Sequence, residues 1–236
     1  MKTLFYLFVF FKVSSALAFC PMGELYQKAG RAFDAWSQYQ ACADENNDAS
    51  SQLYVGQVYL DGNSNVQQSL NMALRYFRMA SENGYAPAQR KLAILMQDME
   101  ELGDMGVKAL ESFEDAWRQE NNSDRKTMSA LSWMMLAAEK PENKWFYFSE
   151  NVLDKEAVQL LPQMKSGMSP EQIEMAQKSA TAWKQEQLLK QAKFLLDDTA
   201  YEDFKQIIYP DKNVKTKISR AQAVEELRKY KMSKRK

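Results

Sequence analysis

The sequence has no histidine, only two cysteines, and few of the residues that form tight turns. Without histidine the chain has no Ser-His-Asp triad, and it lacks both the usual general base and the commonest metal ligand. Cys20 and Cys42 are too few for a metal-binding set, and no glycine-rich phosphate-binding loop is present. Eight glycines and six prolines in 236 residues argue against an all-β protein. We therefore expect a protein without cofactors and without enzyme activity.

The N-terminal residues 1–18 have the pattern of a secretory signal peptide. Lys2 is followed by an apolar stretch, Leu4–Phe11, and by a small-residue motif that ends at Ala18. Lys12 interrupts the apolar stretch, so the segment is too short to span a bilayer. We predict cleavage after Ala18 and export to the periplasm or the medium; an uncleaved anchor is the alternative. No later segment is apolar over the about 18 residues that a membrane helix needs.

Two cysteines in an exported protein suggest a disulfide, because the compartments beyond the inner membrane are oxidising. A Cys20–Cys42 bond would close a loop of about 23 residues, worth roughly 3 kcal/mol on the chain-entropy estimate. Two alternatives stay open. Cys42 could be a buried thiol. Cleavage before Cys20 could instead leave a lipid on its sulfur, although Phe19 is bulkier than the residue usual at that position in lipoproteins.

The formal net charge of zero hides a strong asymmetry. Residues 212–236 carry ten basic and two acidic residues, a net charge of +8, whereas residues 19–211 carry 19 basic and 29 acidic residues, a net charge of −10. The basic tail is either a solvated helix end or a weak contact for anionic membrane surfaces through residues 228–236. Its single aromatic residue, Tyr230, argues against nucleic acid as a partner.

The chain contains an internal repeat. Residues 43–59 and 80–96 align at a constant offset of 37 residues, and small residues recur at the same helical spacings in both copies. A third, partial copy at residues 130–139 parallels residues 73–82 at an offset of 57. Each unit predicts a helix, a short turn and a second helix, and stacked pairs would share one continuous core.

The run Ala80-Ser-Glu-Asn-Gly84-Tyr-Ala-Pro-Ala-Gln89-Arg-Lys-Leu92 resembles the signature of the Sel-one-like repeat (SLR) family, a relative of the tetratricopeptide repeats. The segment Met168–Ile173 resembles the opening of the helix that commonly closes such arrays. Together the similar segments cover roughly residues 36–185. The resemblance implies an all-α fold, a short right-handed α-solenoid of helix-turn-helix repeats with a closing helix. It also implies a scaffold that holds partner proteins on its concave face.

The sequence departs from the family pattern at several positions. Asn47 and Pro141 stand where the second copy has Gly84, and Ala93 stands where the first copy has Gly56. After Glu139 the third copy loses its second helix. The array is therefore expected to be short and irregular.

An insertion separates copies two and three, near residues 102–124. It contains a helix-like stretch over residues 107–120. Four of its apolar residues are expected on one face: Leu110, Phe113, Ala116 and Trp117.

The pattern predicts helices over residues 22–44, 49–61, 67–83, 86–101, 106–120, 125–139, 144–162 and 170–196, with two more near 199–209 and 219–232. Ser169 and Gln172 form a capping box at the eighth helix. An apolar stripe on that helix should cover the end of the array, formed by Ile173, Ala176, Ala180 and Trp183. We expect a signal peptide over 1–18, the array with its closing helix over 19–196, and a helical basic extension over 197–236.

Two further features have alternative interpretations. The carboxylate pairs Glu100-Glu101 and Asp197-Asp198 could serve a hydrolase of envelope polymers, but adjacent residues on a helix point away from each other. The aromatic run Trp145–Phe148 is either buried between the third repeat and the closing helix or partly exposed as an anchor for a partner.

The helices expected over residues 49–61 and 86–101 bury the face that carries the family signature. Their other faces should line the concave surface and bind a protein partner, expected in the cell envelope. We predict that this surface consists of three residues on each helix, related by the 37-residue offset: Tyr54, Gln57, Asp61, Lys91, Ile94 and Asp98. Tyr54 is the expected anchor, because aromatic residues dominate binding hot spots. The alternative is that these are ordinary surface residues.

Overall fold

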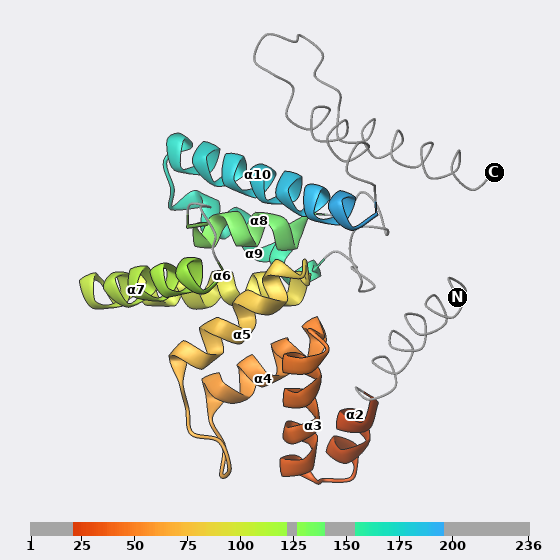
Figure 1. Ribbon diagram of the computed structural model, residues 1–236. Coiled ribbons are helices and arrows are strands. Elements are labelled where there is room, and N and C mark those ends of the chain that lie inside the picture. The colour runs from red at the N-terminus through yellow and green to blue at the C-terminus, as the bar shows by residue number, and fades with distance from the viewer. Residues whose placement is uncertain (1–20, 122–126, 140–153, 196–236) are drawn as a thin grey trace, which may run out of the picture.

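The protein is all-α over residues 21–121, 127–139 and 154–195, the parts of the chain that the computed structural model describes (Figure 1). No β-strand occurs within these ranges. The helices are α2 (Pro21–Lys28), α3 (Ala32–Glu45), α4 (Ala49–Asp61), α5 (Leu70–Glu82), α6 (Ala86–Glu101), α7 (Asp104–Glu120), α8 (Ala130–Ala138), α9 (Lys155–Ser166) and α10 (Pro170–Leu195). Among them, no helix has the length and apolar character that a bilayer-spanning segment requires. The helices expected near 199–209 and 219–232 lie outside the described residues.

The helices pack as successive antiparallel pairs, as the repeat predicts. The first pair is α3 and α4, and the second is α5 and α6. The second helices of these pairs begin 37 residues apart, at Ala49 and Ala86, which confirms the register of the repeat. In the third pair, α8 packs against α9, whose start at Lys155 is later than the 57-residue offset would place it.

The single helix expected over residues 22–44 is wrong, because two helices, α2 and α3, occupy this range and pack against each other. Gly30 adopts a φ of 72°, a left-handed conformation that ends α2. The N–H of Arg31 then donates to the carbonyl of Tyr26 at 2.9 Å and closes the turn. Gly30 lies inside the range predicted as one helix, and it therefore divides that range into α2 and α3.

The turns inside the first and second pairs have the same backbone form. Asn47 has a φ of 53° and Gly84 a φ of 76°. Asparagine is the ordinary residue that best tolerates this region, which explains how it replaces the glycine of the second copy. Pro141, the third residue aligned to this position, lies outside the described residues.

The glutamine of each signature ties the second helix of a pair to the first. Gln52 Nε2 donates to the carbonyl of Ala43 at 3.2 Å, and Gln89 Nε2 donates to the carbonyl of Ser81 at 3.2 Å. Asn83 then links the two turns, because its Nδ2 donates to Asn47 Oδ1 at 3.0 Å; it also donates to Gln52 Oε1 at 3.0 Å. The signature positions therefore hold the array together, and both glutamines are buried.

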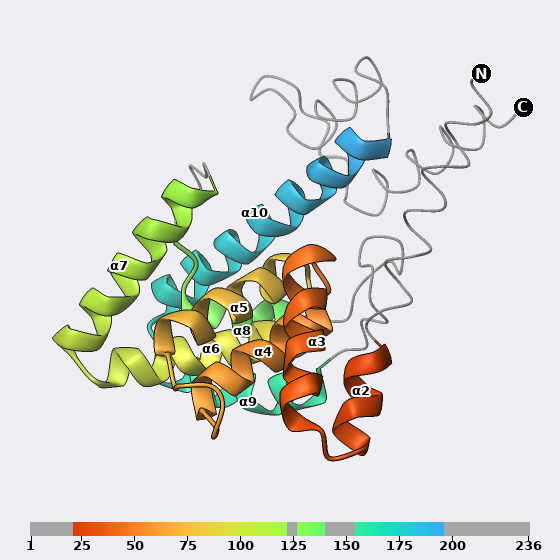
Figure 2. The same cartoon turned by 60° about the horizontal axis from the view of Figure 1, so that its bottom comes forward.

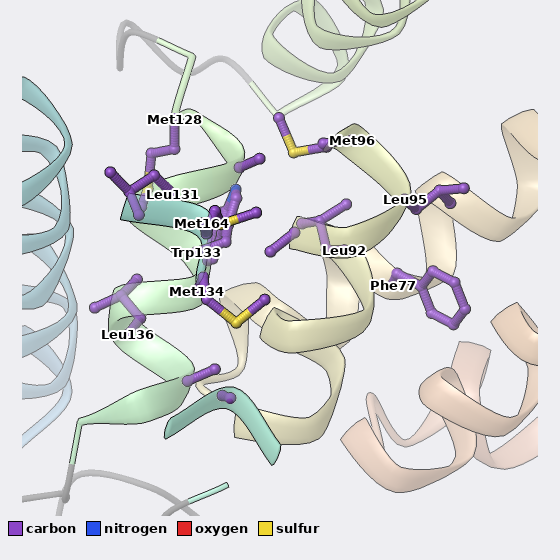
Figure 3. Packing of buried hydrophobic residues seen from close by; sticks show 14 of the residues in the cluster. Phe77, Leu92, Leu95, Met96, Met128, Leu131, Trp133, Met134, Leu136 and Met164 are labelled. Atoms are coloured by element: carbon purple, nitrogen blue, oxygen red, sulfur yellow. The ribbon is translucent and has the colours of Figure 1, made fainter. Parts of the chain in front are cut away.

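The largest apolar cluster lies between α5, α6, α8, α9 and α10 (Figure 3). It includes Phe77, Leu92, Trp133 and Met134, all at most 1% exposed. Trp183 of α10 meets the ring of Trp133 edge-on, with 5.9 Å between the ring centroids. This contact buries the end of the array under the closing helix.

The predicted start and stripe of the closing helix are confirmed. Ser169 N–H donates to Gln172 Oε1 at 2.8 Å, and Gln172 N–H donates to Ser169 Oγ at 3.3 Å. Ala176, Ala180 and Trp183 are buried, and Ile173 is partly buried against the same cluster.

The insertion forms α7, which lies to one side of the array (Figure 2). Helix α6 packs directly against α8, so the array continues without α7. Leu110 and Trp117 of α7 are buried and Phe113 is partly buried, as predicted. Ala116 is exposed, however, and Glu114 is buried in its place, so the predicted face of α7 is rotated.

Candidate partner-binding surface

The residues predicted to bind a partner lie on α4 and α6, which touch each other. The structure thus brings the two predicted faces onto neighbouring helices. The six side chains differ in their exposure to solvent. Only Asp61 and Asp98 are exposed, and the other four are partly buried.

Tyr54, the expected anchor, packs within the first pair. Its ring lies 4.1 Å from the ring of Tyr39 on α3, measured between centroids, and the side chain is half-buried. Burial raises the pKa of both hydroxyl groups above the usual tyrosine value. Tyr54 therefore offers a partner only part of its ring.

The aspartates are the accessible part of the surface. Asp61 ends α4 and accepts a hydrogen bond from Gln57 Nε2 at 2.9 Å. Asp98 is its equivalent on α6 and is exposed. Between them, Lys91 is half-buried and Ile94 packs against the main apolar cluster. The surface thus combines accessible carboxylates with apolar side chains of which only part reaches solvent.

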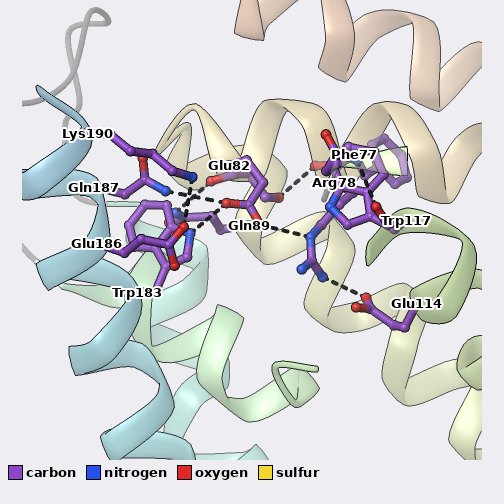
Figure 4. Close-up of polar contacts among 12 residues, drawn as sticks. Phe77, Arg78, Glu82, Gln89, Glu114, Trp117, Trp183, Glu186, Gln187 and Lys190 are labelled. Atoms are coloured by element: carbon purple, nitrogen blue, oxygen red, sulfur yellow. Dashed lines mark hydrogen bonds and ion pairs between the residues drawn. The ribbon is translucent and has the colours of Figure 1, made fainter. Parts of the chain in front are cut away.

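A buried ionic cluster that the sequence analysis missed joins the second pair to α7 and α10 (Figure 4). Arg78 of α5 is 2% exposed and lies 2.6 Å from Glu114 Oε1 and 3.0 Å from Glu82 Oε1. Trp183 Nε1 donates to Glu82 Oε2 at 2.9 Å. The guanidinium also lies 4.9 Å from the centroid of the Trp133 ring.

This cluster is structural, because its contacts join three helices: Arg78 holds α5 to α7 through Glu114, and Glu82 holds α5 to α10 through Trp183. A signal for it was present in the sequence. Arg78 lies four residues after Leu74 and three before Ser81, on the stripe that faces the core, and Glu82 follows it by one helical turn.

The residues considered for catalysis do not converge on a site. Glu100 and Glu101 are both exposed at the end of α6, although partial desolvation raises the pKa of Glu100 above its usual value. Within the described ranges no group of three or more carboxylate or thiol side chains could hold a metal ion. Asp197-Asp198 and the aromatic run Trp145–Phe148 lie outside the described residues.

The cysteine prediction stays open. Cys42 lies on α3 and is 1% exposed. Cys20 lies outside the described residues, so the disulfide between them remains a prediction.

The chain matches no protein-family model and no curated protein. Among solved structures it is similar to c5321, a protective antigen of uropathogenic Escherichia coli strains that displays an SLR fold. The similarity has a TM-score of 0.31 and 15% sequence identity, and covers 85% of this chain and 50% of that chain. This chain thus spans half the length of the antigen, and a likeness at this level supports no conclusion on function.

Proposed function

We propose that the protein is an exported scaffold of SLR-type helical pairs that binds a partner protein through the surface formed by α4 and α6. One observation supports this most. Two pairs in the same register have equivalent turns at Asn47 and Gly84, and their second helices, α4 and α6, contact each other. A repeated surface of this kind offers a partner two related contacts on one rigid frame.

The chemistry of the surface suggests the character of the partner. Asp61 and Asp98 are exposed carboxylates one repeat apart, and the residues between them are polar or partly buried apolar. Exposed carboxylates favour a partner segment with lysine or arginine residues, because opposite charges attract at long range and speed association. The partner is expected in the periplasm or at the cell surface, where the predicted signal peptide would direct the chain.

The sharpest test changes the exposed carboxylates and leaves the partly buried side chains in place. Alanine at Tyr54 or Ile94 would also remove packing within the array, so a loss of binding would be ambiguous. Asp61→Lys combined with Asp98→Lys reverses the surface charge, with a change in unfolding free energy expected within about 0.5 kcal/mol. Glu174→Lys, at an exposed carboxylate on α10, is the matched control.

The expected result is that the intact protein crosslinks one envelope protein in its own cells, that the double variant loses it, and that Glu174→Lys retains it. Equal capture by all three proteins would refute the α4–α6 surface. Capture that survives the double variant but disappears when residues 197–236 are removed would assign binding to the extension.

A further inference from the structure

The turn between α6 and α7 exposes an unusual number of apolar side chains. Leu102 is 69% exposed, Met105 is 79% exposed and Val107 is 38% exposed. We call residues 100–107 the elbow. Gly103, with a φ of 73°, lets the chain reverse there and turns these side chains outward, away from the core. Clustered exposed apolar residues mark contact sites more often than chance exposure does.

The elbow is also strongly acidic. It contains three carboxylates, at Glu100, Glu101 and Asp104, and no basic residue occurs between Lys91 and Lys108.

None of these three carboxylates forms an ion pair with another described residue. Elsewhere, helix carboxylates pair with a lysine one turn away, as Glu24 does with Lys28 and Glu174 with Lys178. The elbow therefore presents uncompensated negative charge around an apolar centre.

We propose that the elbow binds the basic segment 212–236 of this same chain, from a neighbouring copy. The segment carries a net charge of +8, and Ala223, Leu227 and Tyr230 follow one another at spacings of four and three residues. Apolar residues at helical spacing, flanked by lysine and arginine, complement an apolar centre flanked by carboxylates. Charge complementarity thus selects this occupant over an anionic lipid or a nucleic acid, which the elbow would repel.

The position of the elbow favours a second copy as the source of the segment. Both ribbon views show the α6–α7 turn at one side of the described part and the C-terminal end of α10 at the opposite side (Figures 1 and 2). A segment that follows α10 in the same copy would have to cross the array, whereas that of a neighbour would not. The contact is independent of the proposed partner surface.

The test is zero-length carbodiimide crosslinking of the intact protein, with equal amounts of ¹⁴N- and ¹⁵N-labelled chains. We expect linked peptides that join Lys229, Lys231 or Lys234 to Glu101 or Asp104, with mixed-isotope pairs as abundant as the two same-isotope kinds together. These links should weaken as salt screens the charges, over a Debye length that falls to about 3 Å at 1 M.

A matched pair of variants separates specific docking from general attraction. Leu102→Ser with Met105→Ser keeps every carboxylate that can react, and should reduce the elbow links at least about fivefold because the apolar centre is lost. Met175→Ser, at a 61% exposed methionine on α10, should leave them unchanged.

Four results would overturn the proposal. The tail lysines could link as readily to Glu45 or Glu171 as to the elbow, or the serine variant could link as well as the unchanged protein. Links without any mixed-isotope pairs would contradict the contact between copies. Binding of the chain to phosphatidylglycerol vesicles without elbow links would show that the segment serves a lipid surface instead.

Discussion

The first and second helical pairs carry the same signature in the same register, yet their first helices are buried to different degrees. Ser37 and Gln40 of α3 are half-buried, whereas their equivalents on α5, Leu74 and Phe77, are completely buried. The residues of the signature hold the two helices of each pair together. The burial of the other residues depends on where the pair lies in the array. A pair near the end keeps a more polar surface, and an internal pair packs on both sides.

The largest predicted difference concerns Arg78, which has no counterpart in the first pair because Ala41 occupies its position. Arg78→Ala removes the guanidinium from the buried carboxylate of Glu114, and we expect a loss of roughly 3–5 kcal/mol in unfolding free energy. Arg75→Ala is the control, because its ion pair with Glu120 is about half exposed and should contribute at most about 1 kcal/mol. Urea unfolding measures both, and equal losses would contradict the role of the buried cluster.

The next largest loss of stability is expected at Gly56, where the two pairs approach closely. A Cβ at this position would lie 2.6 Å from Cδ1 of Phe77, whereas the second pair already has a buried alanine, Ala93, at the equivalent position. Gly56→Ala should therefore cost roughly 1–3 kcal/mol through overpacking. In thermal unfolding, a Phe77→Leu background should reduce that penalty. Additive losses in the double variant would show that the ring is not the obstacle.

The turn of the second pair should tolerate asparagine but not valine. Gly84 has a φ of 76°, which costs a residue with a Cβ about 1–2 kcal/mol, and a β-branched residue more than most. Gly84→Asn would reproduce the residue that the first pair has at Asn47, with a smaller loss. Chemical denaturation of the two variants checks the order. A valine variant as stable as the asparagine variant would contradict the equivalence of the turns.

The smallest effect is a difference in pH dependence between the equivalent residues Tyr39 and Tyr76. Burial, followed by the hydrogen bond that Tyr76 donates to Asp44 at 2.9 Å, raises the pKa of Tyr76 above its usual value of about 10. Burial also raises the pKa of Tyr39. Above about pH 10 the unfolded chain releases these protons while the folded chain retains them, so stability should be level below that pH and decline above it.

Tyr76→Phe should flatten this decline more than Tyr39→Phe, and should cost about 1 kcal/mol at neutral pH through the lost hydrogen bond. Urea midpoints on either side of about pH 10 provide the comparison. An alkaline decline that both variants retain would assign it to other groups.

The repeated helices were the best predicted part of the fold. The bounds of α4 and α6 are those expected, because small residues and glutamine recur at the same spacings in both copies. The closing helix was equally predictable, since its capping box and apolar stripe are local patterns.

Features that depend on contacts between different helices were harder to predict from the sequence. Gly30 lies inside a pattern that favours one long helix, and only the packing of α2 against α3 shows that the chain turns there. Glu114 shares helical spacing with Leu110 and Trp117, but it is charged and was not among the apolar residues predicted for that face; Arg78 on another helix makes its burial possible. The candidate surface was placed on the expected helices, but the contact between Tyr54 and Tyr39 could not be read from helical spacing alone.

The most direct test of the proposed scaffold function is site-specific photocrosslinking in the cells that produce the protein. A benzophenone side chain is placed singly at Asp61, at Asp98 and, as a control, at Glu174, all of which are exposed. We predict that positions 61 and 98 yield an adduct with the same partner protein and that position 174 yields none. An adduct that forms at Glu174 but at neither aspartate would contradict the assignment of partner binding to α4 and α6.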